Sequence, residues 1–225
     1  MTLSISLDPV SGNFEEFKEY LAWLEGVEGV TLHCDVMDGD FVSRKAMSDE
    51  MYNHLVKNTN KKIDVHLMLS GPNKKINPYI AKAVWGSIQS VSFHVEALSE
   101  EMSLTLLGKI KTMGIGSGVV IDLDTDVKTV SAKILKACDV ITIMSVKAGA
   151  SGQTCDPKTF DKLKYLKKKF PNTRLIVDGG INVETLPLAK NAGADTFVVG
   201  GAVHSAYKEG KGNLRIAALQ EVLVT

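Results

Sequence analysis

Two polar side chains stand two positions apart in a stretch that is otherwise suited to a buried strand. The stretch TLHCDVMDGDFV covers residues 31–42, and in it His33 and Asp35 alternate with Cys34 and Val36. Alternate residues of a β-strand point to the same face of a sheet. An imidazole and a carboxylate, both ligand types for divalent metal ions, are therefore expected to share one side of this strand.

Side chains of the same two kinds follow other apolar runs. His66 lies near the end of IDVHLML (63–69), and Asp178 follows RLIV in RLIVDGG (174–180). A single strand histidine is more often a hydrogen-bonded core residue, and a single aspartate after a strand is often a helix cap. Two imidazoles and two carboxylates together suit one borderline divalent ion such as Zn²⁺, Fe²⁺, Mn²⁺ or Co²⁺. If the four converge, they predict a Lewis-acid metal site formed by His33, Asp35, His66 and Asp178.

The elements around these residues explain how they could converge. Short apolar runs predict strands at 2–6, 29–35, 62–68, 88–95, 116–122, 139–146, 173–178 and 195–200. Helical periodicity lies near 13–25, 48–58, 73–84, 99–112, 126–136, 156–169, 183–191 and 212–223. Strands that alternate with helices are parallel. Eight such units in 225 residues predict an α/β protein with a single (β/α)8 TIM barrel spanning residues 1–225.

A barrel brings the carboxyl ends of all its strands to one rim, which is where the four candidate ligands lie. An open, doubly wound sheet is the alternative, and it usually carries a GxGxxG motif after its first strand. Here the first strand runs into LDPVSGNF without that motif. The barrel is therefore favoured.

Three glycine-containing segments lie near the ends of the last three predicted strands. They are VKAGASGQ (146–153), VDGGIN (177–182) and VVGGAV (198–203). Glycine lets backbone N–H groups approach a phosphate closely, and barrels commonly bind phosphate in the loops after strands seven and eight. The pattern predicts a phosphate site that includes Gly149, Gly152, Gly179, Gly180, Gly200 and Gly201.

Apolar and histidine side chains at the same strand ends complete the expected pocket. Met37, Met68 and Met144 follow apolar strand residues. Methionine usually fills a core, but here the three could form a dry floor beneath a substrate. His94, in SFHVEAL, is either a pocket residue or a structural one.

Composition limits the kinds of partner. Lys plus Arg equals Asp plus Glu at 26 each, which argues against a surface for nucleic acid or anionic membranes. The three cysteines show no CxxC spacing, so a reducing cytoplasm is expected. The first residues do not predict a signal peptide, and no apolar run is long enough to predict a transmembrane helix.

Six segments, in order along nearly the whole chain, resemble the ribulose-phosphate 3-epimerase family. HCDVMDGDFV is similar to the family's H-x-D-x-M-D-G-x-F-V, and DVHLML to its D-x-H-L-M. FHVEA matches its strand-four segment, and IMSVKAGASGQ resembles M-x-V-x-P-G-x-G-G-Q. VDGGIN resembles D-G-G-I, and AGADTFVVGGAV resembles the final A-G-A-D-x-x-V-x-G.

This resemblance implies a metal-dependent epimerisation at C3 of a ketose phosphate, most simply D-ribulose 5-phosphate to D-xylulose 5-phosphate. The family's metal ligands match His33, Asp35, His66 and Asp178. Asp35 and Asp178 would also act as acid and base on opposite faces of the sugar, through a metal-stabilised cis-enediolate. His66 and the three methionines would contact the substrate, and an association into homo-oligomers is expected by analogy.

Several segments depart from the family pattern. The strand-one P-S-I-L-S reads Leu3-Ser4-Ile5-Ser6-Leu7, so Ser4 is expected to contact substrate, with Ser6 as the alternative. Pro-Asn after the second-strand motif is replaced by 43–45 (SRK), and N-P-x-T by 122–125 (DLDT). The loop 147–151 also differs, and Gly201 stands where a serine commonly helps to hold phosphate. We expect these changes to affect the choice of sugar more than the reaction.

Three alternatives differ from this interpretation in substrate or in class. The same chemistry could act on a six-carbon substrate, D-allulose 6-phosphate. A barrel hydrolase is disfavoured because strand one carries serines and no H-x-H. A non-catalytic sugar-phosphate-binding barrel is disfavoured because all four ligand positions are present.

Overall fold

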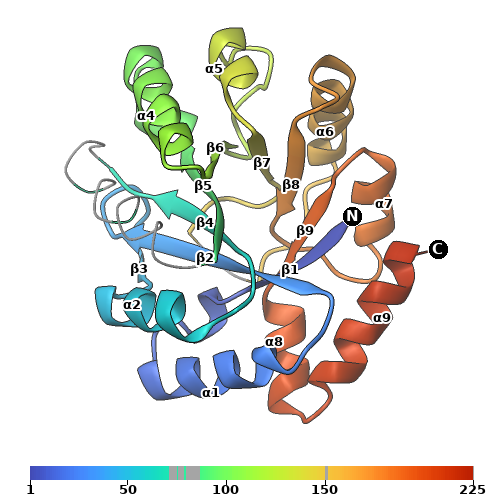
Figure 1. Cartoon of the computed structure of the whole chain (residues 1–225). Coiled ribbons are helices and arrows are strands. Elements are labelled where there is room, and N and C mark those ends of the chain that lie inside the picture. The colour runs from blue at the N-terminus through green and yellow to red at the C-terminus, as the bar shows by residue number, and fades with distance from the viewer. Residues whose placement is uncertain (71–74, 76–78, 80–86, 150–151, 225) are drawn as a thin grey trace.

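The computed structural model describes residues 1–70, 75, 79, 87–149 and 152–224, and its strands form a closed barrel (Figure 1). Eight parallel strands follow the order β1-β9-β8-β7-β6-β5-β4-β2, and β1 pairs again with β2. The predicted TIM barrel is confirmed. The strands of the barrel are β1 (Thr2–Ser6), β2 (Val30–Asp38), β4 (Ile63–Met68), β5 (Ile88–His94), β6 (Gly116–Ile121), β7 (Val140–Met144), β8 (Arg174–Asp178) and β9 (Thr196–Val199).

Helices surround the barrel, as Figure 1 shows. Asn13, Ser48 and Ser99 precede α1, α2 and α4, and each side chain accepts a backbone N–H of the first turn. The helix expected at 73–84 lies largely outside the described residues. The described helices are α1 (Phe14–Glu25), α2 (Asp49–Asn58), α4 (Glu100–Thr112), α5 (Ala132–Ala137), α6 (Lys158–Lys169), α7 (Leu186–Asn191), α8 (Gly201–Lys208) and α9 (Gly212–Val224), with 3-10 turns η1 (Asp8–Val10) and η2 (Val95–Ala97).

Three elements differ from those expected. A short strand, β3 (Lys45–Ala46), pairs antiparallel with the end of β2. Helix α8 begins at Gly201, the second glycine of the pair that follows β9, where no helix was predicted. The helix predicted at 126–136 is shortened to α5, because the side chain of Asp126 accepts the Lys128 N–H and holds a turn there.

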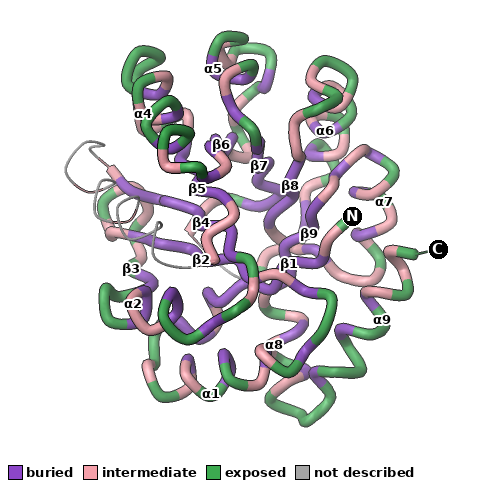
Figure 2. Tube along the Cα trace, viewed as in Figure 1, coloured by how far each residue is buried: buried purple, intermediate pink, exposed green. Residues whose placement is uncertain are grey.

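Alternation along the strands separates an apolar layer from a polar barrel interior. In β2, Leu32, Cys34 and Val36 belong to the large apolar cluster between the sheet and the helices. His33 and Asp35, in the alternate positions, are buried inside the barrel. Figure 2 shows the strands buried and the outer faces of the helices exposed. The helices therefore pack on one face of each strand and leave the other face free for a site.

An ion pair closes the end of the barrel opposite the candidate site. Both guanidinium Nη atoms of Arg174 donate to the carboxylate of Asp64, and Arg174 Nη2 also lies 3.1 Å from Ser90 Oγ. The side chain of Asp64 is 3% exposed and that of Arg174 is 23% exposed. Asp64 thus has a structural partner far along the chain.

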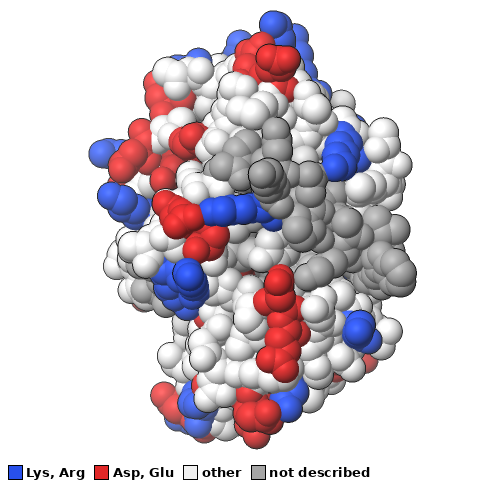
Figure 3. Space-filling model, turned by 90° about the vertical axis from the view of Figure 1, so that its left-hand side faces the viewer, with Lys and Arg blue, Asp and Glu red and all other residues white. Residues whose placement is uncertain are grey.

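The face drawn in Figure 3 carries acidic and basic side chains interspersed among other residues. This mixture agrees with a net charge of zero and does not produce a field of one sign.

Among the described helices, none is both long enough and apolar enough to span a membrane.

Candidate active site

The four metal-ligand candidates meet at the carboxyl ends of β2, β4 and β8. His33 Nε2 lies 3.3 Å from Asp35 Oδ1 and 3.4 Å from Asp178 Oδ2. His66 Nδ1 lies 3.0 Å from Asp35 Oδ1 and 3.5 Å from Asp178 Oδ2. All four residues are buried, and one ligand atom of each lies within 4.8 Å of all the others. Each imidazole therefore faces both carboxylates.

The spacing of these atoms fits one divalent cation among them. Ligand bonds of about 2.0–2.2 Å place neighbouring ligand atoms about 3.0–3.5 Å apart around one ion. His33 Nε2 is buried with no hydrogen-bond partner, although it lies beside two carboxylate oxygens. A nitrogen lone pair and two carboxylates directed at one point form a set of donors that a cation would satisfy.

The electrostatics of the cluster also favour positive charge at its centre. Burial alone would lower the pKa of His33, but the carboxylates of Asp35 and Asp178 raise that pKa well above its usual value. Burial alone would raise the pKa of Asp35, but the imidazoles of His33 and His66 hold it well below the usual range. The ionised form of Asp35 and the positively charged form of His33 are therefore both favoured by their neighbours.

A third histidine, His94, lies directly behind His66. His94 Nε2 is 2.9 Å from His66 Nε2, and the two rings stack at a centroid distance of 5.0 Å. His94 Nδ1 lies 3.2 Å from Glu96 Oε2. His94 is fully buried and does not line the pocket. Of the two roles expected for it, pocket residue or structural residue, the structure supports the structural one.

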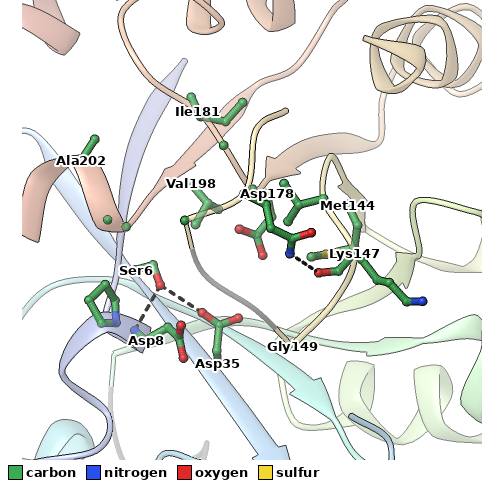
Figure 4. Close-up of a pocket in the computed structure, with 18 of the residues that line it drawn as sticks. Ser6, Asp8, Asp35, Met144, Lys147, Gly149, Asp178, Ile181, Val198 and Ala202 are labelled. Carbon is green, nitrogen blue, oxygen red and sulfur yellow. Dashed lines mark hydrogen bonds between the residues drawn. The ribbon is translucent and has the colours of Figure 1, made fainter. Parts of the chain in front are cut away.

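A cavity of about 470 Å³ opens above the cluster. Asp35 and Asp178 both line it, and Figure 4 shows Asp178 across the cavity from Ser6, Asp8 and Asp35. The three methionines expected in the floor, Met37, Met68 and Met144, also line it and are buried.

Of the two serines considered in strand β1, Ser6 lies in the cavity wall. Its hydroxyl donates to Asp35 Oδ2 at 3.0 Å (Figure 4). Ser4 points into the same barrel interior, but two residues deeper, where its hydroxyl is buried without a hydrogen-bond partner. It does not line the cavity. The expectation of a substrate contact at Ser4 is therefore transferred to Ser6.

The six glycines expected at the phosphate site all line the same cavity, from the loops after β7, β8 and β9. Gly179 and Gly180 have φ of 111° and 61°, in the region that favours glycine. A Cβ on Gly180 would lie 2.3 Å from the Cys155 backbone nitrogen. Helix α8, which was not predicted, begins at Gly201 and directs its first N–H groups to this side.

A pocket residue not foreseen from the sequence is Asp8. Its carboxylate lines the cavity, and Arg44 Nη1 donates to Asp8 Oδ2 at 2.7 Å. The Asp8 N–H donates to Ser6 Oγ, so Arg44, Asp8, Ser6 and Asp35 form a continuous hydrogen-bonded chain. An aspartate directly after the first strand, in SLDPV, was the signal available in the sequence.

Two more of the segments that depart from the family pattern, 122–125 and the described part of 147–151, lie near the site. The Asp122 N–H donates to Glu96 Oε1 at 3.0 Å, which ties the loop after β6 to the group behind His66. The backbone oxygen of Lys147 accepts from the Gln153 amide within the loop after β7 (Figure 4). Residue 151, another difference from the family pattern, lies outside the described residues.

The chain resembles solved barrels over its full length. A mutant tryptophan synthase α-subunit from Pyrococcus furiosus aligns with a TM-score of 0.69 at 14% identity, covering 100% of this chain and 98% of that one. The 3-hexulose-6-phosphate synthase of Salmonella typhimurium aligns with a TM-score of 0.66 at 18% identity, covering 100% and 99%. At these identities the likeness shows the fold alone.

Sequence comparison identifies closer relatives. A ribulose-phosphate 3-epimerase of Methanocaldococcus jannaschii is 30% identical over 224 residues, covering 97% of this chain and 92% of that one. The cytoplasmic isoform of ribulose-phosphate 3-epimerase from Oryza sativa subsp. japonica is 31% identical over 182 residues, covering 80% and 78%. The sequence model of the ribulose-phosphate 3 epimerase family matches residues 3–204. The chain therefore belongs to the ribulose-phosphate 3-epimerase family.

Proposed function

We propose that this epimerase interconverts D-ribulose 5-phosphate and D-xylulose 5-phosphate by moving the proton at C3. Family membership and the names of the relatives support this activity. The observation that carries the proposal is the pair of buried carboxylates, Asp35 and Asp178, which contact the same two imidazoles and line one cavity.

The two carboxylates would be the acid and the base. The C3 proton of a ketose is acidic because it lies next to the C2 carbonyl, and its removal leaves an enediolate. Inversion requires that the proton leave from one face and return to the other. Asp35 on β2 and Asp178 on β8 are separated by β1 and β9 in the barrel, so a sugar lying between them would present a different face to each. An ionised carboxylate can take the C3 proton as a general base, and the other carboxylate must carry a proton to deliver one to the opposite face.

His33, Asp35, His66 and Asp178 would hold one divalent cation, Zn²⁺, Fe²⁺, Mn²⁺ or Co²⁺. When bound, such an ion supplies Lewis-acid stabilisation of the negative charge that develops on the substrate oxygens. Ser6, which donates to Asp35, would orient that carboxylate. Met37, Met68 and Met144 would exclude water beneath the sugar, which strengthens the electrostatic interactions above them.

The phosphate would lie against the glycine segments that line the cavity. Gly179, Gly180, Gly200 and Gly201 would offer backbone N–H groups, and the N-terminus of α8 would add a favourable dipole. Gly149 and Gly152 would bound the cavity from the loop after β7.

The variant Gly201→Ser is expected to lower KM for the sugar phosphate by about three- to tenfold, since a hydroxyl hydrogen bond to a charged group contributes about 1.5 kcal/mol or less when partly solvated. A Cβ at this position meets no atom within 4 Å, so the hydroxyl fits without strain. Gly108→Ser, at an exposed position of α4 with equally open surroundings, should leave KM unchanged. An unaltered KM in Gly201→Ser would remove this residue from the phosphate site.

A six-carbon substrate, D-allulose 6-phosphate, is the second candidate, and the Asp8–Arg44 pair favours it. Arg44 belongs to the segment 43–45 that departs from the family pattern, and it holds a carboxylate in the cavity wall that could accept a further sugar hydroxyl. Steady-state assays of both sugars with metal-loaded protein decide between them. Good turnover of D-allulose 6-phosphate with an inactive D-ribulose 5-phosphate reaction would overturn the five-carbon proposal.

We place this reaction in the cytoplasm, in line with the cytoplasmic isoform among the relatives and the three unpaired cysteines. Association into a homo-oligomer stays a prediction.

A further inference from the structure

Behind the candidate metal site, three side chains form a hydrogen-bonded row that leads away from the cavity. Nδ1 of His66 faces Asp35 and Asp178, and Nε2 of the same ring faces Nε2 of His94 at 2.9 Å. His94 Nδ1 in turn faces Glu96 Oε2 at 3.2 Å. The row runs from β4 to the end of β5 and into η2, which are neighbours in the barrel.

The direction of the hydrogen bonds in this row is determined by its last member. An ionised carboxylate only accepts hydrogen bonds, so His94 must carry a proton on Nδ1 to bond Glu96. Burial alone would raise the pKa of Glu96, but hydrogen bonds from His94, Thr125 and the Asp122 N–H lower it to about 2. Glu96 is therefore ionised at neutral pH.

Two nitrogens 2.9 Å apart share one proton, because two N–H groups pointing at each other would repel. A neutral His94 that is protonated on Nδ1 accepts at Nε2, so the proton between the rings belongs to His66 Nε2. In the metal-free protein a further proton on His66 Nδ1 bonds Asp35 Oδ1 at 3.0 Å, and once that proton leaves, Nδ1 presents its lone pair to the centre of the cluster. A metal ion binds to that lone pair and not to an N–H.

We propose that Glu96 and His94 are positioning residues that hold His66 in the tautomer whose Nδ1 can bind the metal. This inference rests on the metal site proposed above and extends it beyond its four ligands. Neither residue lines the cavity, so their effect on the reaction passes through His66. Partners of this kind commonly change metal affinity by about 10–100-fold when they are replaced.

The variant Glu96→Gln is expected to reverse the donor and acceptor directions of the hydrogen bonds in the row, while the side chain keeps nearly the same shape. Glu96 Oε1 accepts from the Asp122 N–H at 3.0 Å, so the amide oxygen of the variant must occupy that place. The amide NH₂ then points at His94 Nδ1 and makes that nitrogen an acceptor. His94 moves its proton to Nε2, His66 must accept there, and the remaining proton of a neutral His66 moves to Nδ1, where the metal would bind.

Two measurements test this inference on the full chain. Nitrogen-15 NMR of histidine-labelled, metal-free protein reports which ring nitrogen carries the proton. In the wild type we expect His94 to be protonated on Nδ1, and in Glu96→Gln on Nε2. Zn²⁺ affinity, measured by competition with a chromophoric chelator, is expected to fall by about 10–100-fold in Glu96→Gln.

Glu100→Gln is the matched control, because it makes the same change at an exposed residue that pairs with Lys133. Its Zn²⁺ affinity should equal that of the wild type. Zn²⁺ affinity of Glu96→Gln within twofold of the wild type, or a wild-type His94 that carries its proton on Nε2, would overturn the proposal. A wild type that binds no Zn²⁺ would instead refute the proposed metal site, and the NMR measurement would still decide the direction of the row.

Discussion

Asp178→Asn is expected to reduce kcat/KM by at least about 10³-fold, since a positioned proton-transfer group alone contributes about 10²–10⁴-fold. The change removes a base and one negative charge from the candidate metal site. The backbone oxygen of Asp178 still accepts the N–H of Ser145 at 2.7 Å, and asparagine has nearly the same shape as aspartate. The barrel should therefore remain folded, with an unchanged far-UV circular dichroism spectrum.

Asp161→Asn makes the same chemical change on the exposed face of α6, where Asp161 contacts only Lys164 among the ion pairs of the described residues. Its kcat/KM should match that of the wild type. Normal turnover by a folded Asp178→Asn protein would exclude Asp178 from the reaction. A variant that lost both fold and activity would show that Asp178 serves mainly to hold β8 in the barrel.

Arg174→Met is expected to destabilise the barrel by about 3 kcal/mol, at the lower end of the range for breaking a buried ion pair because Arg174 is partly exposed. The variant leaves the carboxylate of Asp64 buried without its guanidinium partner. For a chain of this length the melting temperature should fall by roughly 6–12 °C. At 25 °C the kcat/KM should be unchanged, because Asp64 and Arg174 lie outside the candidate active-site cavity.

The double variant Asp64→Leu/Arg174→Met provides the control. Replacing both partners removes the uncompensated charge, so most of the lost stability should return. Thermal unfolding followed by circular dichroism measures all three proteins. A single variant as stable as the wild type would show that this pair contributes little to the barrel, and a change in kcat/KM without a change in stability would contradict its purely structural role.

The barrel and the cluster were predictable from the sequence because both depend on simple periodicities. Parallel strands in a barrel carry apolar residues on the face that meets the helices, so His33 and Asp35 stand out against Cys34 and Val36. The carboxyl ends of all the strands share one rim. Polar residues at the ends of β2, β4 and β8 could therefore be placed together without knowledge of any contact.

Features that depend on contacts made only in the folded chain were not predictable in the same way. Strand β3 has two residues and is held by pairing with β2, so no period reveals it. Helix α8 begins at the second of two glycines, which are poor helix formers, and its residues pack against α9. The contact of Arg44 with Asp8 joins residues 36 positions apart, and only the folded barrel brings them together.

The choice between Ser4 and Ser6 shows a related limit. Both residues point into the barrel, so alternation alone cannot distinguish them. Their depth in the barrel distinguishes them. Strand β1 pairs with β2 in a register that places Ser6 beside His33 at the site and Ser4 beside Thr31, two residues deeper. Family resemblance led to Ser4, whereas the register of the sheet favours Ser6.

The exchange of the C3 hydrogen in D₂O tests the central proposal, proton transfer to and from C3 by Asp35 and Asp178, most directly. D-Ribulose 5-phosphate and D-allulose 6-phosphate are each incubated with the protein, supplied in turn with Zn²⁺, Fe²⁺, Mn²⁺ and Co²⁺, and followed by proton NMR. We expect one sugar to yield its C3 epimer with deuterium at C3, and Asp178→Asn to abolish this incorporation. If neither sugar gains deuterium at C3 with any of these metals, the chain does not catalyse the proposed epimerisation.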